Sequence, residues 1–453
     1  MSESPATRRS RVSPARAAVL PHLESKARRF PELFPDPLDT SGLEPRDARL
    51  AEAIDREVTA RWWTLRTIIE PLLTQPWHRQ HHAVIAALMG GAAQVFFFDR
   101  VPDHAAIDES VGWCRTTGAS RAAGVVNAVL RKVVALRGER RERVDLTQDD
   151  HLVLPDGSGW KLNAPVFAGA WPERLAEQTG CGAHFLSRVR ASDGDEEAAR
   201  LAAHAMCHAP VLLHGLDGHE HTTAHDEPGF HVLTGAGRLQ EVLQSCPQAL
   251  VQDPTSAAAC RATAAMVPDL IVDWCAGRGT KTRQLAMMHP DATIIATDAS
   301  QARRRDLAPL AATADHVQVR QPESCAEFAG RTDLLLLDVP CSNSGVLARR
   351  PEARHRQDPA TRDRLVALQR QIAADALALL APGGALIWAT CSIDPDENER
   401  QIEWLTTWHP LSVQTMHRQT GRGGPGGPPT AWRDGGFFAV LRSEAPANRE
   451  DSA

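Results

Sequence analysis

The sequence predicts an all-helical N-terminal domain followed by an α/β domain with a doubly wound, mostly parallel sheet. Two observations support this fold class. Between about residues 15 and 136 the apolar residues recur at helical spacing, with no alternation of the kind that marks strands. After Asp253, short apolar runs alternate with polar or helical stretches, which is typical of a parallel sheet. A chain of 453 residues is long enough for two or three such domains.

The helical part is clearest in two segments. LAEAIDREVTARWWTLRTIIEPLL (residues 50–73) and HHAVIAALMGGAAQVFFFD (residues 81–99) carry apolar residues at helical spacing, and Pro, Gly and Asp punctuate the chain between them. We therefore expect a helical domain over residues 15–140, preceded by a flexible basic tail over residues 1–14.

The middle of the chain is mixed in character. We expect a connector and an α+β lead-in over residues 141–248, with APVLLHG as one short strand. Seven histidines lie between His204 and His231, but their spacings match no zinc pattern. This segment is therefore interpreted as a solvated connector, and no metal site is expected.

The α/β domain is predicted over residues 249–443, with a loose tail over 444–453. GRGGPGGPP (residues 421–429) is a loop by composition, and GGFFAVLR is the expected last strand. The other expected strands are short apolar runs at residues 271–274, 293–298, 317–320, 334–338 and 385–390.

Composition limits the class of protein. No run of 18 apolar residues is present and the N-terminus has no apolar signal region, so neither a membrane span nor secretion is expected. Nine cysteines without a C-x-x-C pair favour free thiols in the cytoplasm. The net charge is −6, yet basic clusters occur, as in RRPEARHR. Such clusters are either solvated helix faces or phosphate-binding surfaces. We expect a cytoplasmic monomer.

A glycine-bearing turn indicates a nucleoside-containing ligand. LIVDWCAGRGTKTRQLAMM reads as strand, tight turn and helix, in which Gly277 and Gly279 would let backbone N–H groups approach a ligand. Asp298 ends the next expected strand, where a carboxylate suits a ribose hydroxyl pair. A phosphate-binding P-loop is excluded because Cys275 and Thr280 stand where it needs glycines.

Two cysteines follow two expected strands. Cys341 comes three residues after Asp338, and Cys391 follows ALIWAT, 50 residues later. In a doubly wound sheet the C-terminal ends of adjacent strands line the usual ligand crevice. The two thiols therefore either face one ligand or are small buried apolar side chains, as most free cysteines are.

The motifs around these cysteines resemble those of RNA 5-methylcytosine methyltransferases. LLLLDVPCSNSGVLARRPEARHR is similar to D-A-P-C-S-x-[ST]-G-x-x-R-R-x-P-E-x-[RK], and ATCSIDPDENE to [ST]-T-C-S-x-x-x-x-E-N-E. LVQDPTSAAAC, DWCAGRGTKT and RDGGFFAVLR resemble three further motifs of that family. The helical segments EPRDARLAEAIDREVTARWWTLRTIIEPLL, FFFDRVPDHAAIDESVGWC and AAGVVNAVLRKV resemble a NusB-like domain. Together they resemble the 16S ribosomal RNA methyltransferase B branch, over about residues 15–443.

The resemblance implies a Rossmann-like methyltransferase domain that uses S-adenosylmethionine to methylate cytosine C5 in RNA, most readily 16S ribosomal RNA. It implies that Cys391 attacks C6 of cytosine, that Cys341 helps to remove the C5 proton and release the enzyme, and that Asp338 lies near the donor and the base. The cofactor-binding residues that it implies are Cys275, Ala276, Gly277, Arg278, Gly279, Thr280, Lys281, Asp298, Glu323 and Asp338. The implied RNA-binding residues are Arg349, Arg350 and Arg354.

The chain departs from the family in the turn. Where the family has Ala-Ala-Pro-Gly-Gly-Lys-Thr, this chain has Ala-Gly-Arg-Gly-Thr-Lys-Thr, from Ala276 to Thr282. Thr280 takes a positive φ only at a cost, so the turn must differ if the family's conformation needs one there. Two alternatives therefore stay open: a non-catalytic RNA-binding or ribosome-assembly protein with a decayed cofactor site, and a transfer RNA cytosine-C5 methyltransferase.

Overall fold

The structure is a computed structural model that describes residues 12–235 and 237–444. Its described residues form two compact units. Unit 1 draws on residues 12–208, 347–358 and 424–426, and unit 2 on residues 209–235, 237–346, 359–423 and 427–444. Within the described ranges, no helix combines the length and the apolar character needed to cross a membrane.

Unit 1 begins with the expected helical bundle. α4 is buried on every side, which accounts for its continuous run of apolar and small residues. Its neighbours pack around it in one hydrophobic core that includes Leu20, Ile54, Leu88, Val111 and Leu130. The helices of the bundle are α1 (Pro14–Arg29), α2 (Pro45–Ala60), α3 (Trp62–Ile69), α4 (His82–Phe97), α5 (Asp103–Thr116) and α6 (Ala123–Leu136).

Three further helices and a small sheet complete unit 1. The sheet is antiparallel in the order β1-β3-β2. Short 3-10 helices lie at Glu70–Leu72, Trp77–Arg79, Ser120–Ala122 and Pro351–Arg356. The remaining elements are β1 (Glu139–Arg141), β2 (His151–Val153), β3 (Gly159–Lys161), α7 (Glu173–Thr179), α8 (Ala183–Asp193) and α9 (Asp195–Met206).

Unit 2 opens with a four-stranded sheet in the order β5-β6-β4-β7. Its elements are β4 (Leu212–His214), β5 (Thr222–Ala224), β6 (Phe230–Leu233), α10 (Leu239–Ser245) and β7 (Leu250–Val251). The interpretation of the histidine-rich segment as a solvated connector is wrong, because it contributes β4 to β6. His225 within it is buried, and its Nε2 lies 2.8 Å from the Trp432 carbonyl oxygen.

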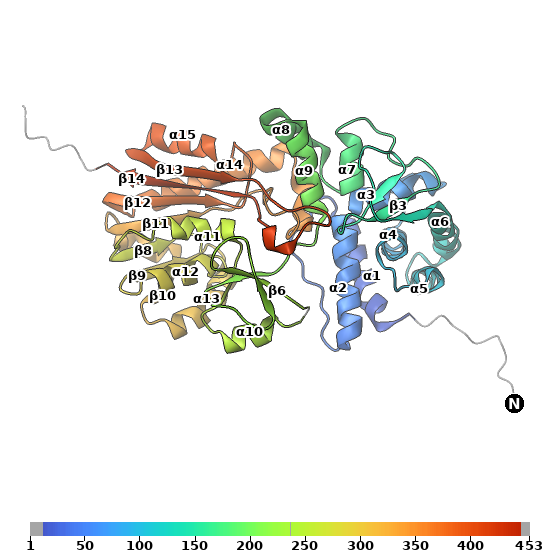
Figure 1. The fold of residues 1–453 in the computed structure, drawn as a ribbon, viewed down its shortest axis with the longest axis horizontal. Coiled ribbons are helices and arrows are strands. Elements are labelled where there is room, and N and C mark those ends of the chain that lie inside the picture. The colour runs from blue at the N-terminus through green and yellow to red at the C-terminus, as the bar shows by residue number, and fades with distance from the viewer. Residues whose placement is uncertain (1–11, 236, 445–453) are drawn as a thin grey trace, which may run out of the picture. The chain divides into compact units, whose positions relative to one another are not determined.

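The main sheet of unit 2 confirms the predicted fold class. It has the strand order β10-β9-β8-β11-β12-β14-β13 (Figure 1). The strands from β10 to β12 are parallel, and β14 and β13 add antiparallel pairs at one edge. The strands are β8 (Leu270–Asp273), β9 (Thr293–Thr297), β10 (Val317–Arg320), β11 (Thr332–Asp338), β12 (Leu380–Thr390), β13 (Leu411–Gln419) and β14 (Gly436–Ser443).

Each strand expected in the α/β domain has a counterpart in this sheet, and β13 is an additional edge strand that the sequence did not predict. The residues of β13 are mostly exposed, so it carries little of the apolar signal that marks the buried strands. The glycine-rich segment predicted as a loop contains only an isolated bridge at Arg422, followed by the 3-10 helix Pro429–Ala431.

Helices cover both faces of the main sheet. Leu335 and Leu337 of β11 point into a core with α14 (Pro359–Leu377) and α15 (Glu399–Trp408). Leu334 and Leu336 point the other way, into a core with α11 (Pro254–Arg261), α12 (Thr280–Met288) and α13 (Gln301–Thr313). This two-sided burial explains the unbroken leucine run in β11. A 3-10 helix (Pro322–Phe328) follows β10.

Candidate active site

The glycine-bearing turn joins β8 to α12. Gly277 and Gly279 have φ angles of +58° and +81°, in the left-handed region where only glycine is free of strain. Thr280 does not share a positive φ and instead begins α12. Both positions of the turn that need a positive φ are thus occupied by glycine. Thr280 does not have to adopt a positive φ, so its presence in the turn causes no strain. Around Gly277, a Cβ would meet only the Cys275 carbonyl oxygen, at 3.9 Å, so the turn leaves room beside it.

Asp298 follows β9 and lies against this turn. Its Oδ2 accepts a hydrogen bond from the Gly277 N–H at 3.1 Å, and its Oδ1 accepts one from the Ser300 N–H at 2.8 Å. Arg303 lies 3.4 Å from Oδ2. The carboxylate is only 4% exposed, and each of its oxygens can accept a further bond. The structure therefore brings the predicted ribose-binding carboxylate to the predicted turn.

Lys281 and Asp338 form an ion pair that links the turn to β11. The Lys281 Nζ lies 2.7 Å from Asp338 Oδ2. Burial by itself lowers the pKa of Lys281, but the charge of Asp338 and the hydrogen bond to it raise that pKa above its ordinary value. Lys281 is consequently cationic at neutral pH, and it holds the Asp338 carboxylate toward the ends of the central strands.

Asp273 is a buried carboxyl group in the same region that sequence reasoning missed. Its Oδ2 accepts a hydrogen bond from the Thr282 hydroxyl at 2.6 Å, while its buried Oδ1 has no hydrogen-bond partner among the described residues. Burial raises the pKa of Asp273 to about 7, which the Thr282 hydrogen bond opposes and the charge of Asp338 reinforces. A buried polar atom without a partner is rare in folded proteins, which is consistent with a ligand completing this site.

Cys341 and Cys391 meet at the ends of β11 and β12. The two strands are parallel and pair Asp338 with Ala389, so the residues that follow leave the sheet side by side. The two Sγ atoms lie 3.2 Å apart. Cys341 is 9% exposed, and Cys391 is half-buried. The hydrogen bond with Cys391, and then burial, raise the pKa of the Cys341 thiol well above its ordinary value. Cys341 therefore keeps its proton at neutral pH.

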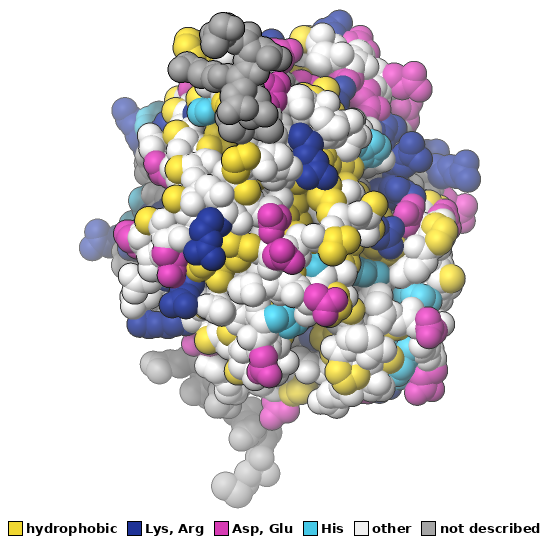
Figure 2. Space-filling view, turned by 90° about the vertical axis from the view of Figure 1, so that its left-hand side faces the viewer, with side chains coloured by type: hydrophobic (Ala, Val, Ile, Leu, Met, Phe, Trp, Pro, Cys, Tyr) yellow, Lys and Arg dark blue, Asp and Glu magenta, His cyan; other side chains and the backbone are white. Residues whose placement is uncertain are grey.

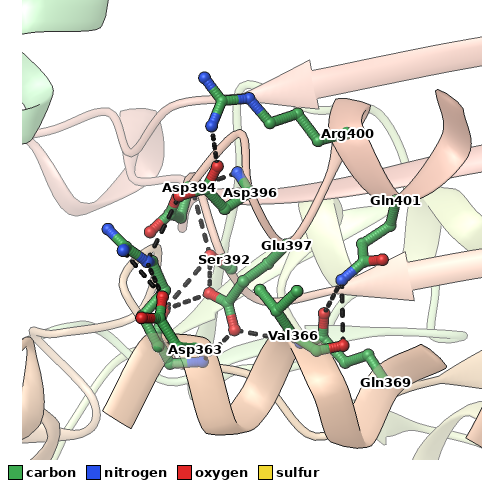
Figure 3. Close-up of polar contacts among 11 residues, drawn as sticks. Asp363, Val366, Gln369, Ser392, Asp394, Asp396, Glu397, Arg400 and Gln401 are labelled. Carbon is green, nitrogen blue, oxygen red and sulfur yellow. Dashed lines mark hydrogen bonds and ion pairs between the residues drawn. The ribbon is translucent and has the colours of Figure 1, made fainter. Parts of the chain in front are cut away.

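Glu397 forms hydrogen bonds with both of the segments that carry the cysteines. It is fully buried, and its carboxylate accepts hydrogen bonds from the Ser342 N–H at 2.9 Å and from the Gln369 side chain at 3.1 Å. The hydroxyl groups of Ser342 and Ser392 also donate to it. Figure 3 shows Glu397 directed toward Ser392 and toward Gln369 on α14. Burial raises the pKa of Glu397, although the two serine hydrogen bonds lower it.

Sequence reasoning did not select Glu397, although it belongs to the quoted ATCSIDPDENE motif. Each cysteine is followed by a serine, and one carboxylate binds both serines. Removing it would take a charged acceptor away from several buried donors, which is costly. The carboxylate is thus a positioning group for the thiol pair.

The remaining predicted site residues differ in how far they are exposed to solvent. Glu323 is exposed in the 3-10 helix after β10, and Arg278 is exposed in the turn. Arg350 is exposed, Arg349 is half-buried, and Arg354 is only 1% exposed. The Arg354 guanidinium donates hydrogen bonds to the backbone carbonyls of Leu347, Ala60, Thr179 and Ala205. Because it is committed to these carbonyls, we do not include Arg354 among the residues proposed to bind RNA.

The charge on one face of the molecule is mixed. Figure 2 shows Lys and Arg side chains on that face dispersed among Asp, Glu and apolar side chains, with no continuous basic surface. Phosphate binding there would rely on a few separate cations. Within the described ranges, no group of three or more His, Cys, Asp and Glu side chains could hold a metal ion.

Two family models match the chain. The model described as 16S rRNA methyltransferase RsmB/F matches residues 264–439, which contain the glycine turn and both cysteines. The NusB family model matches residues 18–135, the helical bundle of unit 1.

Curated relatives and solved structures agree with these matches. The chain is 29% identical over 429 residues to ribosomal RNA small subunit methyltransferase B of Xanthomonas campestris, covering 88% of this chain and 89% of that one. It is 30% identical over 359 residues to the protein of the same name in Pasteurella multocida, covering 76% and 75%. The crystal structure of a protein designated PH0851 shares the fold, with a TM-score of 0.68 and 18% identity, covering 88% of this chain and 91% of that one.

Proposed function

Because the chain belongs to the 16S rRNA methyltransferase RsmB/F family and is therefore an RNA methyltransferase, we propose that it methylates C5 of a cytosine in 16S ribosomal RNA. The single observation that carries the choice of C5 is the pair of thiols 3.2 Å apart at two adjacent strand ends. C5 of cytosine is a poor nucleophile until a nucleophile has added to C6, and a second group is then needed to release the product.

The roles of the two thiols follow from their surroundings. The raised pKa of Cys341 keeps its proton on its own sulfur, so we assign the attack on C6 to Cys391. The Cys391 thiolate forms a bond to C6, which makes C5 electron-rich enough to take a methyl group. After methylation the C5 proton leaves, the electron pair of that C–H bond restores the C5–C6 double bond, and the S–C6 bond breaks.

Cys341 is suited to the release step. While Cys391 is free, its sulfur raises the pKa of Cys341. Once Cys391 is bonded to C6 as a neutral thioether, ionisation of Cys341 no longer competes with a second thiolate beside it, so the Cys341 thiol loses a proton more easily. Cys341 can then assist removal of the C5 proton, directly or through Asp338 nearby. The pair thus provides the two groups in the order in which the reaction needs them.

The residues around the turn fit S-adenosylmethionine, which supplies a methyl group on a sulfonium centre when bound. Asp298 would hold the ribose hydroxyls, and its carboxylate is held in place by the hydrogen bond from the Gly277 N–H of the turn. The buried Asp273 Oδ1 offers a polar atom that still lacks a partner among the described residues. Asp338, held by Lys281, stands between this turn and the thiols. The exposed Glu323 is proposed to face the adenine end.

We expect calorimetric titration of S-adenosylmethionine into the purified protein to show one binding site. Asp298→Ala should weaken that binding at least about tenfold, because a buried carboxylate that binds two hydroxyls contributes about 1.5–3 kcal/mol. Asp306→Ala, which removes an exposed carboxylate on the neighbouring helix α13, is the matched control and should leave the affinity unchanged. A folded wild-type protein that shows no binding would favour the alternative of a non-catalytic RNA-binding protein.

Bisulfite sequencing tests the substrate. In a strain that lacks this protein, we expect one cytosine of 16S ribosomal RNA to lose its C5 methyl group, and expression of the wild-type chain to restore it. Loss of methylation at transfer RNA cytosines, with 16S ribosomal RNA unchanged, would instead support the transfer RNA alternative. An unchanged methylation pattern in all RNA would contradict the proposal.

A further inference from the structure

Asn343 follows Cys341 by two residues and contacts Cys391, and it stands at a position that the family motif leaves open. Its backbone has φ of +60°, and it is the one non-glycine residue with a positive φ in residues 12–235 and 237–444. Asparagine tolerates this conformation better than most residues, because its short polar side chain can bond locally. The unusual φ directs the side chain back toward the thiols.

The hydrogen bonds of Asn343 determine which way its amide points. The Nδ2 group donates to the Cys341 carbonyl oxygen at 3.1 Å. That carbonyl can only accept, so the amide nitrogen must lie on its side. The Oδ1 atom is therefore the one that faces Cys391, and the Cys391 Sγ lies 3.2 Å from it. An amide oxygen has no proton to donate, so this contact is an S–H···O bond in which Cys391 is the donor.

We propose that Asn343 is a positioning residue that restrains Cys391 as a protonated thiol in the RNA-free protein. The amide oxygen binds the S–H form and repels a thiolate, so it opposes ionisation until the contact is broken. The resting arrangement is a chain of donors, in which the Cys341 S–H donates to the Cys391 sulfur and the Cys391 S–H donates to Asn343 Oδ1.

Other charges face the same sulfur. The Lys281 ammonium interacts with Cys391 and favours its thiolate, but Asp338 largely neutralises that cation. The buried Glu397 carboxylate acts against ionisation of the neighbouring Cys341. Asn343 supplies a neutral, directional acceptor among these charges, and displacing its side chain removes that acceptor from Cys391. This restraint would keep the nucleophile from reacting with other electrophiles before a base is in place.

Alkylation by iodoacetamide at neutral pH tests the restraint without RNA or a methyl donor. The thiolate is the reactive form, so the rate at Cys391 reports its fraction. Asn343→Gly keeps the positive φ without strain and removes the acceptor, and we expect Cys391 to react about three- to tenfold faster, which is the factor for a lost neutral hydrogen bond. Asn343→Asp keeps the size and the backbone conformation but places a negative charge at the sulfur, and we expect alkylation at least about tenfold slower.

The alkylated proteins are digested, and peptide mass spectrometry measures the alkylation of each cysteine separately, which supplies the control. Cys246 is half-buried and lies outside the thiol pair, so its alkylation rate should be the same in all three proteins. A merely structural role would make both variants more reactive, at Cys341 as well as at Cys391. A Gly variant no faster than wild type at Cys391, or an Asp variant no slower, would overturn the proposal. The inference rests on the proposed function only for naming Cys391 the nucleophile, and a protein inactive on RNA could still show this alkylation pattern.

Discussion

Replacing Cys391 by alanine is expected to abolish methyl transfer to RNA and to leave no covalent protein–RNA adduct. Without the sulfur that adds to C6, C5 of cytosine stays too weakly nucleophilic to take a methyl group. A loss of at least about a thousandfold is expected for removal of a catalytic nucleophile. Transfer of labelled methyl groups from S-adenosylmethionine to unmethylated 16S ribosomal RNA measures the rate, and a denaturing gel detects any adduct.

Cys246→Ala is the matched control for this variant, since it removes a half-buried thiol that lies outside the pair. It should methylate RNA at the wild-type rate. Circular dichroism should show that both variants are folded. Substantial methylation by a folded Cys391→Ala protein would rule out Cys391 as the nucleophile.

Replacing Cys341 by alanine is expected to trap the enzyme on its RNA. Cys391 is intact in this variant, so it still adds to C6, but the thiol that assists loss of the C5 proton is missing. The S–C6 bond therefore persists, and the covalent complex accumulates to a large fraction of the protein. On a denaturing gel it runs as a band shifted by the mass of the RNA, and turnover falls to near zero.

The double variant Cys341→Ala, Cys391→Ala tests which of the two cysteines forms the covalent bond to RNA. It should give no shifted band, because the trapped bond is made by Cys391. If Cys391→Ala instead traps RNA and Cys341→Ala does not, the two roles are reversed. That result would also contradict the argument from the raised pKa of Cys341.

Much of the fold could be predicted from local patterns. The strands from β8 to β12 and β14 are short apolar runs because both faces of the sheet are covered, and this burial leaves a direct trace in the sequence. The edge strand β13 was missed because most of its residues are exposed and need not be apolar. The histidine-rich segment was misread for a related reason, since a small antiparallel sheet needs few apolar residues.

The sequence also identified the cysteines, the turn and Asp298 as candidate site residues. It did not identify the residues that form hydrogen bonds to them in the folded protein. Glu397 contacts Ser342 across 55 residues of sequence, and Asn343 contacts Cys391 across 48. Arg354 was selected from the sequence as an RNA-binding residue, but in the structure it is buried against backbone carbonyls. Charge in a sequence does not reveal whether a guanidinium faces solvent or the protein interior.

The sequence by itself thus determined the helical N-terminal domain, the buried strands of the main sheet, the two cysteine motifs and the family resemblance, because periodicity and motif spacing are local properties of the chain. Only the tertiary structure decided that the two thiols lie 3.2 Å apart, that Asn343 contacts Cys391, and that Glu397 accepts a hydrogen bond from Ser342. Hydrogen-bond geometry and burial depend on residues that are distant in sequence, so they exist only once the chain has folded.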